Sequence, residues 1–370
     1  MRHVAKTLAT MGAVALIAAG CSSKADNNNA SDTTSQAPSN GTSASTSGGA
    51  KIKACMVLDT GGVDDKSFNQ SSWAGLTAAA KANPNISPSY VASNSANDYT
   101  PNLTTETNAS CDTIIAVGGL MGDNVKKIAT ANPNQHYAEI DNPSTADNVY
   151  GIQYNTAQGG FLGGYLAAAM SKTGKVGTWG GLNIPPVTIY MDGFWEGVQY
   201  YNKQNNKDVK VLGWDETNQK GGTFAGSFTD QNKGKAITQA MEQAGADVVF
   251  PVAGGSGLGA GAAAAASGGK LNLIWVDTDG CESAAQYCKY FISSVTKGLT
   301  KSVEDYMQQV GSGTFPTGNY IGTLQNGGTG LAPFHDFDSK VPQNVKDALQ
   351  KITSDIESGA IKITSPSQPK

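Results

Sequence analysis

Three aspartates close short apolar runs, and their carboxylates are the side chains with the clearest chemical potential in the chain. They are Asp59, Asp141 and Asp277. Two carboxyl groups about 5–9.5 Å apart can cleave a glycosidic bond, one as the acid and the other as nucleophile or base. That chemistry also needs a carboxyl with a raised pKa in a dry pocket, which the sequence leaves open. A nucleoside or glycoside hydrolase is therefore one hypothesis.

An aromatic ring lies among polar residues shortly after the first of these runs. The stretch DDKSFNQSSWAGL (residues 64–76) sets Phe68 and Asn69 where a strand gives way to a helix. Such a phenylalanine is either part of the core or a flat surface offered to a ligand. Phe68 follows Asp59 by nine residues, which places it in the first strand-to-helix loop.

Other catalytic and nucleotide-binding motifs do not occur in the sequence. The chain has no GxSxG elbow for a serine hydrolase and no GxxxxGK[ST] loop for a nucleotide. The glycines of GGSGLG, which begins at Gly254, are expected to let the backbone approach a ligand at a helix start. A formal net charge of −4 argues against a nucleic-acid partner. We predict no cofactor and no bound metal.

The first fifty residues indicate targeting rather than folding. Residues 1–20 have a basic start and an apolar stretch, too short to span a membrane, that ends in small residues before Cys21. This arrangement resembles a bacterial lipobox and implies cleavage before Cys21 and diacylglycerol on its sulfur; an ordinary signal peptide is the alternative. Residues 22–50 have no aromatic residue and no aliphatic residue larger than Ala. We predict a disordered tether over 21–50 that holds a lipid-anchored body at the extracytoplasmic face of the bacterial cell membrane.

Four cysteines follow the predicted lipidation site, and their even number favours disulfides outside the cytoplasm. Two of them lie seven residues apart, and the other two each precede an apolar run. The predicted pairs are Cys55–Cys111 and Cys281–Cys288. Free buried thiols are the alternative. Zinc is disfavoured because no CxxC pair occurs and only two histidines follow the signal peptide.

Apolar runs alternate with amphipathic helical patterns from residue 51 onward. The alternation predicts βαβ units, and because it runs through two sets, 51–155 and 174–277, it predicts an α/β fold of two doubly wound parallel-sheet lobes. The predicted strands include 55–59, 113–118, 135–141, 175–179, 247–252 and 273–277; the predicted helices include 71–82, 122–131, 157–171, 189–203, 232–244, 256–267, 299–310 and 342–358. Ligands of open α/β sheets bind at the carboxyl ends of the strands, so we expect a cleft between the lobes.

Several stretches together resemble the basic membrane protein family of bacterial lipoproteins, the PnrA-like purine-nucleoside-binding proteins of ABC importers. The stretches are LDTGGVDDKSFNQSSWAGL (58–76), IIAVGGLMGD (114–123), YAEID (137–141), GGFLGGYLAA (159–168), GSFTDQNKGKA (226–236), VFPVAGGSGLGA (249–260), IWVDTDG (274–280) and ISSVTKGL (292–299). The resemblance implies a type I periplasmic-binding fold, in which three crossovers join two lobes that close on the ligand. We place the first lobe at 51–156 and 281–318, and the second at 157–280 and 319–365.

The resemblance implies how the purine base would be held. Phe68 and Phe228 resemble the two rings that stack on the faces of the base, and such stacking contributes roughly 1–3 kcal/mol per base. Asp59 would accept hydrogen bonds from purine N–H groups. Asn69 can both donate and accept at the edge of the base.

It also implies how the sugar would be held. Asp141 and Asp277 resemble the carboxylates that bind the ribose hydroxyls, with Asp279 as an alternative to Asp277. Lys297 resembles the basic residue near the sugar. The sequence departs from the family at Trp179, which either adds a stacking surface or packs inside the second lobe.

These observations lead to three hypotheses of function. The first is a monomeric, lipid-anchored solute-binding protein without enzymatic activity, which delivers adenosine, guanosine or inosine to an ABC permease. The second is an extracytoplasmic nucleoside or glycoside hydrolase that uses the aspartates. The third is a surface lipoprotein with an adhesin or signalling role. We adopt the first; the preferred nucleoside and the permease stay open.

Overall fold

The computed structural model describes residues 50–369, which belong to one compact unit. The predicted signal peptide, the lipidation site Cys21 and the tether lie outside the described residues. Within 50–369, no helix combines the length and the apolar character that crossing a bilayer requires.

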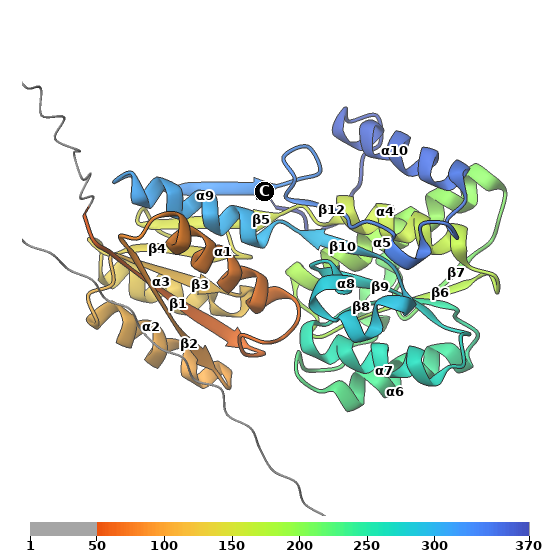
Figure 1. Cartoon of the computed structure of the whole chain (residues 1–370), viewed down its shortest axis with the longest axis horizontal. Helices are drawn as coiled ribbons and strands as arrows, with labels where there is room; N and C mark the ends of the chain where they lie inside the picture. The colour runs from red at the N-terminus through yellow and green to blue at the C-terminus, as the bar shows by residue number, and fades with distance from the viewer. Residues whose placement is uncertain (1–49, 370) are drawn as a thin grey trace, which may run out of the picture. The chain divides into compact units, whose positions relative to one another are not determined.

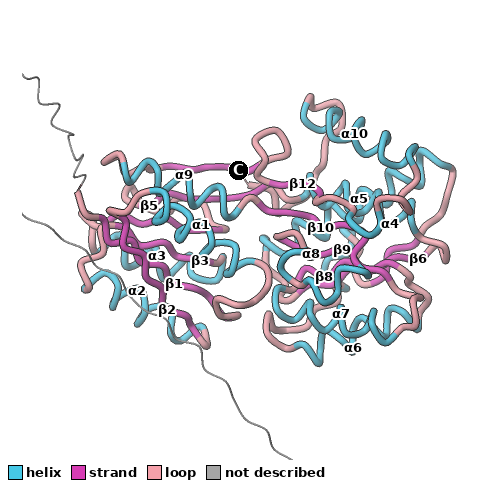
Figure 2. Tube along the Cα trace, in the orientation of Figure 1, coloured by secondary structure: helices cyan, strands magenta, loops and turns pink. Residues whose placement is uncertain are grey.

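Two six-stranded sheets form the centre of this unit, one in each lobe (Figures 1 and 2). The first has the order β2-β1-β3-β4-β5-β11, and the second has the order β7-β6-β8-β9-β10-β12. Their strands are β1 (Ile52–Thr60), β2 (Ile86–Ser93), β3 (Thr113–Val117), β4 (His136–Ile140), β5 (Val149–Tyr154) and β11 (Gly318–Gly322), then β6 (Lys175–Gly180), β7 (Lys210–Leu212), β8 (Val248–Val252), β9 (Asn272–Asp277), β10 (Phe291–Lys297) and β12 (Thr329–Leu331). Strand β12 runs antiparallel to β10, whereas β11 runs parallel to β5. The two doubly wound α/β lobes are as predicted.

Helices cover both faces of each sheet. They are α1 (Phe68–Ala82), α2 (Tyr99–Asn108), α3 (Gly122–Ala131), α4 (Ala157–Met170), α5 (Pro185–Asn205), α6 (Gln231–Gln243), α7 (Leu258–Ala266), α8 (Gly280–Ser283), α9 (Leu299–Gly311) and α10 (Gln343–Glu357). Short 3₁₀ turns are η1 (Ala96–Asp98), η2 (Gly119–Met121), η3 (Glu216–Gly221), η4 (Gly254–Gly257), η5 (Ala285–Tyr290) and η6 (His335–Phe337). Figure 1 shows α9, in blue, beside α1, in dark orange, although they are far apart in the sequence.

Strand β1 shows why the central strands read as continuous apolar runs. Its residues alternate between two cores: Met56 and Leu58 pack on one face of the sheet, and Cys55 and Val57 on the other. Helices cover both faces, so every residue of the strand is buried except Lys53, near its start, and Thr60, at its end.

The glycine-rich stretch 159–168 brings two helices of the second lobe unusually close. A Cβ at Gly164 would lie 1.9 Å from the carbonyl oxygen of Phe194, and one at Gly197 would lie 2.0 Å from that of Phe161. Helices α4 and α5 therefore pack backbone against backbone. This packing fixes the position of α5, and its first turns face the other lobe.

The chain crosses between the sheets three times: after β5, after β10 and between β11 and β12. The predicted lobe boundaries after residue 280 need correction. Strand β10 (Phe291–Lys297) pairs with β9 and belongs to the second lobe, whereas β11 (Gly318–Gly322) pairs with β5 and belongs to the first. The alternation of strands and helices does not reveal which sheet edge a strand joins, because that choice depends on contacts distant in sequence.

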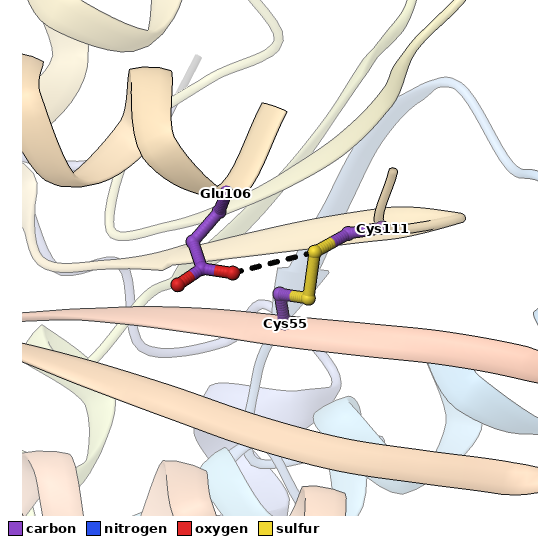
Figure 3. A group of neighbouring side chains, drawn as sticks. All are labelled: Cys55, Glu106 and Cys111. Carbon is purple, nitrogen blue, oxygen red and sulfur yellow. Dashed lines mark hydrogen bonds between the residues drawn. A yellow bond between two sulfur atoms is a disulfide. The ribbon is translucent and has the colours of Figure 1, made fainter. Parts of the chain in front are cut away.

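Two disulfides join the pairs that the sequence predicts. Cys55, on β1, is bonded to Cys111, just before the neighbouring strand β3, and the carboxyl of Glu106 lies 3.3 Å from Cys111 Sγ (Figure 3). The second disulfide joins Cys281 to Cys288. Two clusters of potential metal ligands occur among residues 50–369, and each includes a disulfide sulfur, which is not a thiolate ligand.

Candidate ligand-binding site between the two lobes

A cavity lies at the carboxyl ends of the two sheets and is lined by both lobes; its empty space of about 530 Å³ includes some open solvent. Seven of the ten predicted ligand-binding residues line it: Asp59, Phe68, Asp141, Phe228, Gly254, Asp277 and Lys297. Parallel strands bring residues that are distant in sequence to one edge of a sheet, so two such edges facing each other gather these side chains.

The loop between β1 and α1 shows why polar residues surround Phe68. Asp65 Oδ1 accepts hydrogen bonds from the backbone N–H groups of Ser67 and Gln70 at 3.0 and 3.1 Å, and its Oδ2 accepts from that of Asn69 at 2.9 Å. The first N–H groups of a helix have no partner within the helix, and Asp65 supplies one. Burial raises the pKa of Asp65 to about 6, and these bonds limit the rise. Helix α1 therefore begins at Phe68, a residue of the cavity wall.

Asn69 positions Asp59 rather than lining the cavity itself. Its Nδ2 donates a hydrogen bond to Asp59 Oδ1 at 2.9 Å. Gly118 lies against the other oxygen, where a Cβ would be 2.3 Å from Asp59 Oδ2. Burial raises the pKa of Asp59 well above its usual value, and the bond from Asn69 opposes that rise. A carboxyl that keeps its proton more readily can donate as well as accept a hydrogen bond.

An ion pair stands at the centre of the cavity wall. Lys297 Nζ lies 2.6 Å from Asp141 Oδ1 and 2.7 Å from its Oδ2, and both side chains are buried. The ammonium also lies over the rings of Phe68, Tyr154 and Tyr190, at 4.8, 5.0 and 5.9 Å from their centroids. Burial raises the pKa of Asp141, and the positive charge of Lys297 works against this rise. The pair presents both signs of charge to a ligand within one small region.

Asp277 is held by two hydroxyl groups, one from each lobe. Tyr190 donates to its Oδ1 at 2.7 Å, and Ser67 donates to its Oδ2 at 2.6 Å. Ser67 belongs to the first lobe, so this bond joins the lobes across the cleft. Nearby, the indole N–H of Trp275 donates to the carbonyl of Lys66 at 3.3 Å and joins the same two surfaces.

The geometry can be compared with known proteins. The sequence model of the family "ABC transporter substrate-binding protein PnrA-like" matches residues 52–365. The chain belongs to this family. It is thus an ABC transporter substrate-binding protein, with the two-lobed α/β fold of type I periplasmic-binding proteins.

Individual PnrA-like relatives and solved structures agree with this assignment. An ABC transporter nucleoside-binding protein BmpA of Lactococcus lactis is 30% identical over 335 residues, which cover 86% of this chain and 90% of the relative. A CD4+ T-cell-stimulating antigen of Listeria monocytogenes is 32% identical, with 85% and 88% covered. A crystal structure of an ABC transporter solute-binding protein from Aeropyrum pernix superposes with a TM-score of 0.77 at 26% identity and covers 86% of this chain and 94% of that one.

Besides Asn69, two predicted residues of this PnrA-like protein do not line the cavity. Trp179 is fully buried in the core of the second lobe, where its Nε1 donates to Thr238 Oγ1 at 3.1 Å. A Cβ at Gly234 would lie 2.9 Å from its ring, so Trp179 packs against α6, and a stacking role is wrong. The sequence could not settle this because the face to which a strand residue points depends on the register of the sheet.

Asp279 also lies outside the cavity, whereas Asp277 lines it. Its Oδ1 accepts from the backbone N–H of Cys281 at 2.9 Å and caps α8, while its Oδ2 lies 2.6 Å from His335 Nε2. Asp279 therefore acts in the second lobe, and Asp277 is the carboxylate of the cavity wall.

The sequence reasoning missed two side chains that hold the site together. Ser67 directly precedes Phe68 in the stretch 64–76, so its place in the sequence could have indicated a role at the site. Tyr190 lies within α5, where an aromatic residue is indistinguishable from core packing, and its hydroxyl contact with Asp277 gives no sequence pattern.

Proposed function

We propose that this PnrA-like protein binds a purine nucleoside between its lobes and delivers it to an ABC permease. The observation that carries the proposal is the lining of one cavity by Phe68 from the first lobe and Phe228 from the second, next to buried carboxylates and an ammonium. Flat rings suit a base, and carboxylates with an ammonium suit the hydroxyl groups of a sugar. The nucleoside-binding name of the lactococcal relative supports the same class of ligand.

Each group of the wall has a role in this proposal. Phe68 and Phe228 stack on the base, and Asp59 bonds its N–H or nitrogen atoms at the edge. Asp141, Lys297 and Asp277 hold the ribose. Because Asp141 is paired with Lys297, and both oxygens of Asp277 accept bonds from hydroxyl groups, neither is placed as a free acid, and this favours binding over hydrolysis.

The proposal extends to the location of the protein and to its partners. Diacylglycerol on Cys21 and the tether after it would keep a monomeric body near its permease at the extracytoplasmic face of the cell membrane. Closure of two lobes around a ligand creates one continuous surface for recognition by a permease. We expect adenosine, guanosine or inosine as the ligand.

Isothermal titration of residues 50–370 against adenosine, guanosine, inosine, cytidine and ribose tests the proposal. We expect micromolar or tighter binding of a purine nucleoside, weakened roughly 5-fold to 150-fold in Phe68→Ala, the equivalent of about 1–3 kcal/mol of stacking. Tyr90→Ala, which removes an exposed ring from the edge strand β2, is the matched control and should bind like the parent.

Absence of heat with every nucleoside, from a protein shown to be folded, would contradict the proposal. Chromatography of the titrated mixture measures free base at the same time. Its accumulation would favour the hydrolase instead.

A further inference from the structure

Three side chains that can bind a metal meet in the second lobe, beside the disulfide Cys281–Cys288. One ligand atom from each of Asp279, Cys281 and His335 lies within 4.8 Å of the others. The side chains of His335 and Asp279 are 33% and 14% exposed, so an ion can reach the cluster from solvent. Cys288, which is bonded to Cys281, brings a second sulfur to the same place. None of these residues lines the proposed nucleoside site.

The carboxylate and the imidazole of this cluster already face each other. His335 Nε2 lies 2.6 Å from Asp279 Oδ2, while Asp279 Oδ1 accepts from the backbone N–H of Cys281 at 2.9 Å. A hydrogen bond of this kind behind a carboxylate fixes the orientation of a metal ligand. His335 also has a left-handed backbone, with φ of 43°, which is costly for a residue other than glycine and is common at functional sites. Both side chains are therefore oriented before an ion binds.

The loop that carries the two cysteines is anchored by more than its disulfide. The ring of Tyr287 packs on α7, where a Cβ at Gly261 would lie 2.4 Å from Tyr287 Cδ2. At the start of the loop, a Cβ at Gly280 would lie 2.8 Å from the ring of Phe291. Reduction of the disulfide leaves these contacts in place, so the two freed thiols stay near Asp279.

The two disulfides of the protein differ in their access to a reductant. Cys55 and Cys111 are 0% and 3% exposed and lie in a core of the first lobe. Cys281 and Cys288 are both half-buried, in a loop. Thiol–disulfide exchange requires a thiolate to reach a sulfur atom, so a dithiol should reduce the second disulfide before the first. The cluster at the first disulfide contains Glu106 but no histidine.

We propose that reduction by a dithiol converts the cluster of the second lobe into a zinc site formed by Asp279, Cys281, Cys288 and His335. The dithiol becomes a disulfide as it passes two electrons and two protons to the cysteines. Zn²⁺ then replaces the two thiol protons, which are released to solvent. Two thiolates, one imidazole and one carboxylate are a donor set that zinc binds with tetrahedral geometry. In the oxidised protein only the imidazole and the carboxylate can act as ligands.

The spacing of the cysteines does not indicate this site, because no CxxC pair occurs. The histidine comes from η6, which is distant in the sequence and packs against η5 and β10. Ligand atoms of a tetrahedral zinc ion lie roughly 3–4 Å apart, so His335 and Asp279 need only separate slightly as the sulfurs approach. Thiolates are soft ligands, which favour zinc over magnesium and calcium.

Zinc titration of residues 50–370 tests the proposal. The protein is reduced with dithiothreitol, separated from it by gel filtration under argon, and titrated with zinc in competition with a chromophoric chelator. We expect two free thiols per chain and a zinc Kd below about 100 nM, as in structural zinc sites with thiolate ligands. The oxidised protein should bind zinc at least about 100-fold more weakly, because it lacks two of the four ligands. Cobalt(II) in place of zinc should show the charge-transfer absorption of thiolate ligands only in the reduced protein.

Variants at the loop surface identify the ligands. His335→Ala should weaken zinc binding by the reduced protein at least about tenfold. Cys281→Ser combined with Cys288→Ser should bind zinc no better than the oxidised parent. Asp336→Asn removes an exposed carboxylate next to His335 in the sequence, and as the matched control it should leave the zinc Kd unchanged. Circular dichroism checks that each variant is folded.

Four outcomes would overturn the proposal. The first is a reduced protein with two free thiols that binds zinc no more tightly than the oxidised protein. The second is unchanged zinc binding in His335→Ala. The third is the absence of free thiols after reduction, which would mean that the loop disulfide is inaccessible. The fourth is zinc binding that persists in the Cys281→Ser, Cys288→Ser variant, which would place the ion elsewhere. No nucleoside enters these titrations, so their result is independent of the proposed function.

Discussion

The two lobes end corresponding strands with an aspartate but hold it in different ways. Asp141 follows β4 and Asp277 ends β9, strands that take the same place in their sheets, and both residues have a left-handed backbone, with φ of 73° and 66°. Asp141 is held by the ammonium of Lys297, and Asp277 by the hydroxyl groups of Tyr190 and Ser67. In each case one partner comes from the other lobe. Both carboxylates are therefore completed only when the lobes are together.

The strands also differ two residues earlier. Glu139 on β4 is fully buried, and burial raises its pKa to about 8, although a bond from Asn142 Nδ2 at 2.6 Å opposes the rise. The corresponding residue of β9 is Trp275, whose indole N–H reaches the first lobe. At this strand position the first lobe thus has a titratable carboxyl group, whereas the second has a neutral indole that contacts the other lobe.

Among variants that test this comparison between the lobes, we expect Lys297→Met to lower the free energy of unfolding most. It leaves Asp141 buried without its cation, and removal of one partner of a buried pair typically costs about 3–5 kcal/mol. Denaturant unfolding measures the loss. Lys301→Met, which breaks an exposed pair with Asp305, is the matched control and should cost less than about 1 kcal/mol. Equal losses in the two variants would show that Asp141 does not depend on its charge partner.

The disulfides provide a second contrast between the lobes. Cys55–Cys111 closes a loop of sequence separation 56 in the first lobe, and Cys281–Cys288 one of 7 in the second. Loop entropy predicts that replacing the first pair by Ala costs about 4 kcal/mol and replacing the second about 2 kcal/mol. Thermal unfolding of the two double variants shows which replacement costs more stability. The reverse order would mean that contacts of the short loop outweigh chain entropy.

The pH dependence of stability sharpens the contrast between Glu139 and Trp275. Between pH 4.5 and about 8 the unfolded chain releases the Glu139 proton while the folded protein keeps it. The free energy of unfolding should therefore fall as pH rises through this range, by a few kcal/mol in total. Glu139→Gln should remove the contribution of Glu139 to this dependence and be more stable than the parent at pH 8 but not at pH 4.5. The exposed Glu357→Gln is the control, and an unchanged pH profile in Glu139→Gln would contradict the assignment.

The smallest effects should come from the hydroxyl groups that hold Asp277. Tyr190→Phe removes one buried hydrogen bond and should lower the free energy of unfolding by about 1–2 kcal/mol. Ser67→Ala removes a bond that exists only across the cleft, so it should also increase the radius of gyration of the unliganded protein in solution scattering. If both variants scatter alike, the bond from Ser67 does not help to hold the lobes together.

The elements that the sequence predicts best are those buried on both sides. Helix α3 lies at 122–131 as predicted, and the central strands β3, β4, β6, β8 and β9 lie within one residue of their predicted bounds at each end. The missed elements lack a clear apolar pattern. Strand β2 is polar and contains Pro88, which suits its place at the edge of the sheet, and helix α2 is polar and contains Pro101.

The sequence by itself determined the two α/β lobes and the cysteine pairs, and strand-end positions, which are local features, indicated the aspartates of the cavity wall. The resemblance to the family added Phe68, Phe228 and Lys297, which also line the cavity. The tertiary structure alone decided that Trp179 is core and that Asp277 rather than Asp279 faces the cleft. It also decided that β10 belongs to the second lobe and β11 to the first, the reverse of the predicted assignment. It also brought Ser67 and Tyr190 to Asp277. These outcomes depend on strand register and on contacts between segments more than a hundred residues apart, which no local pattern records.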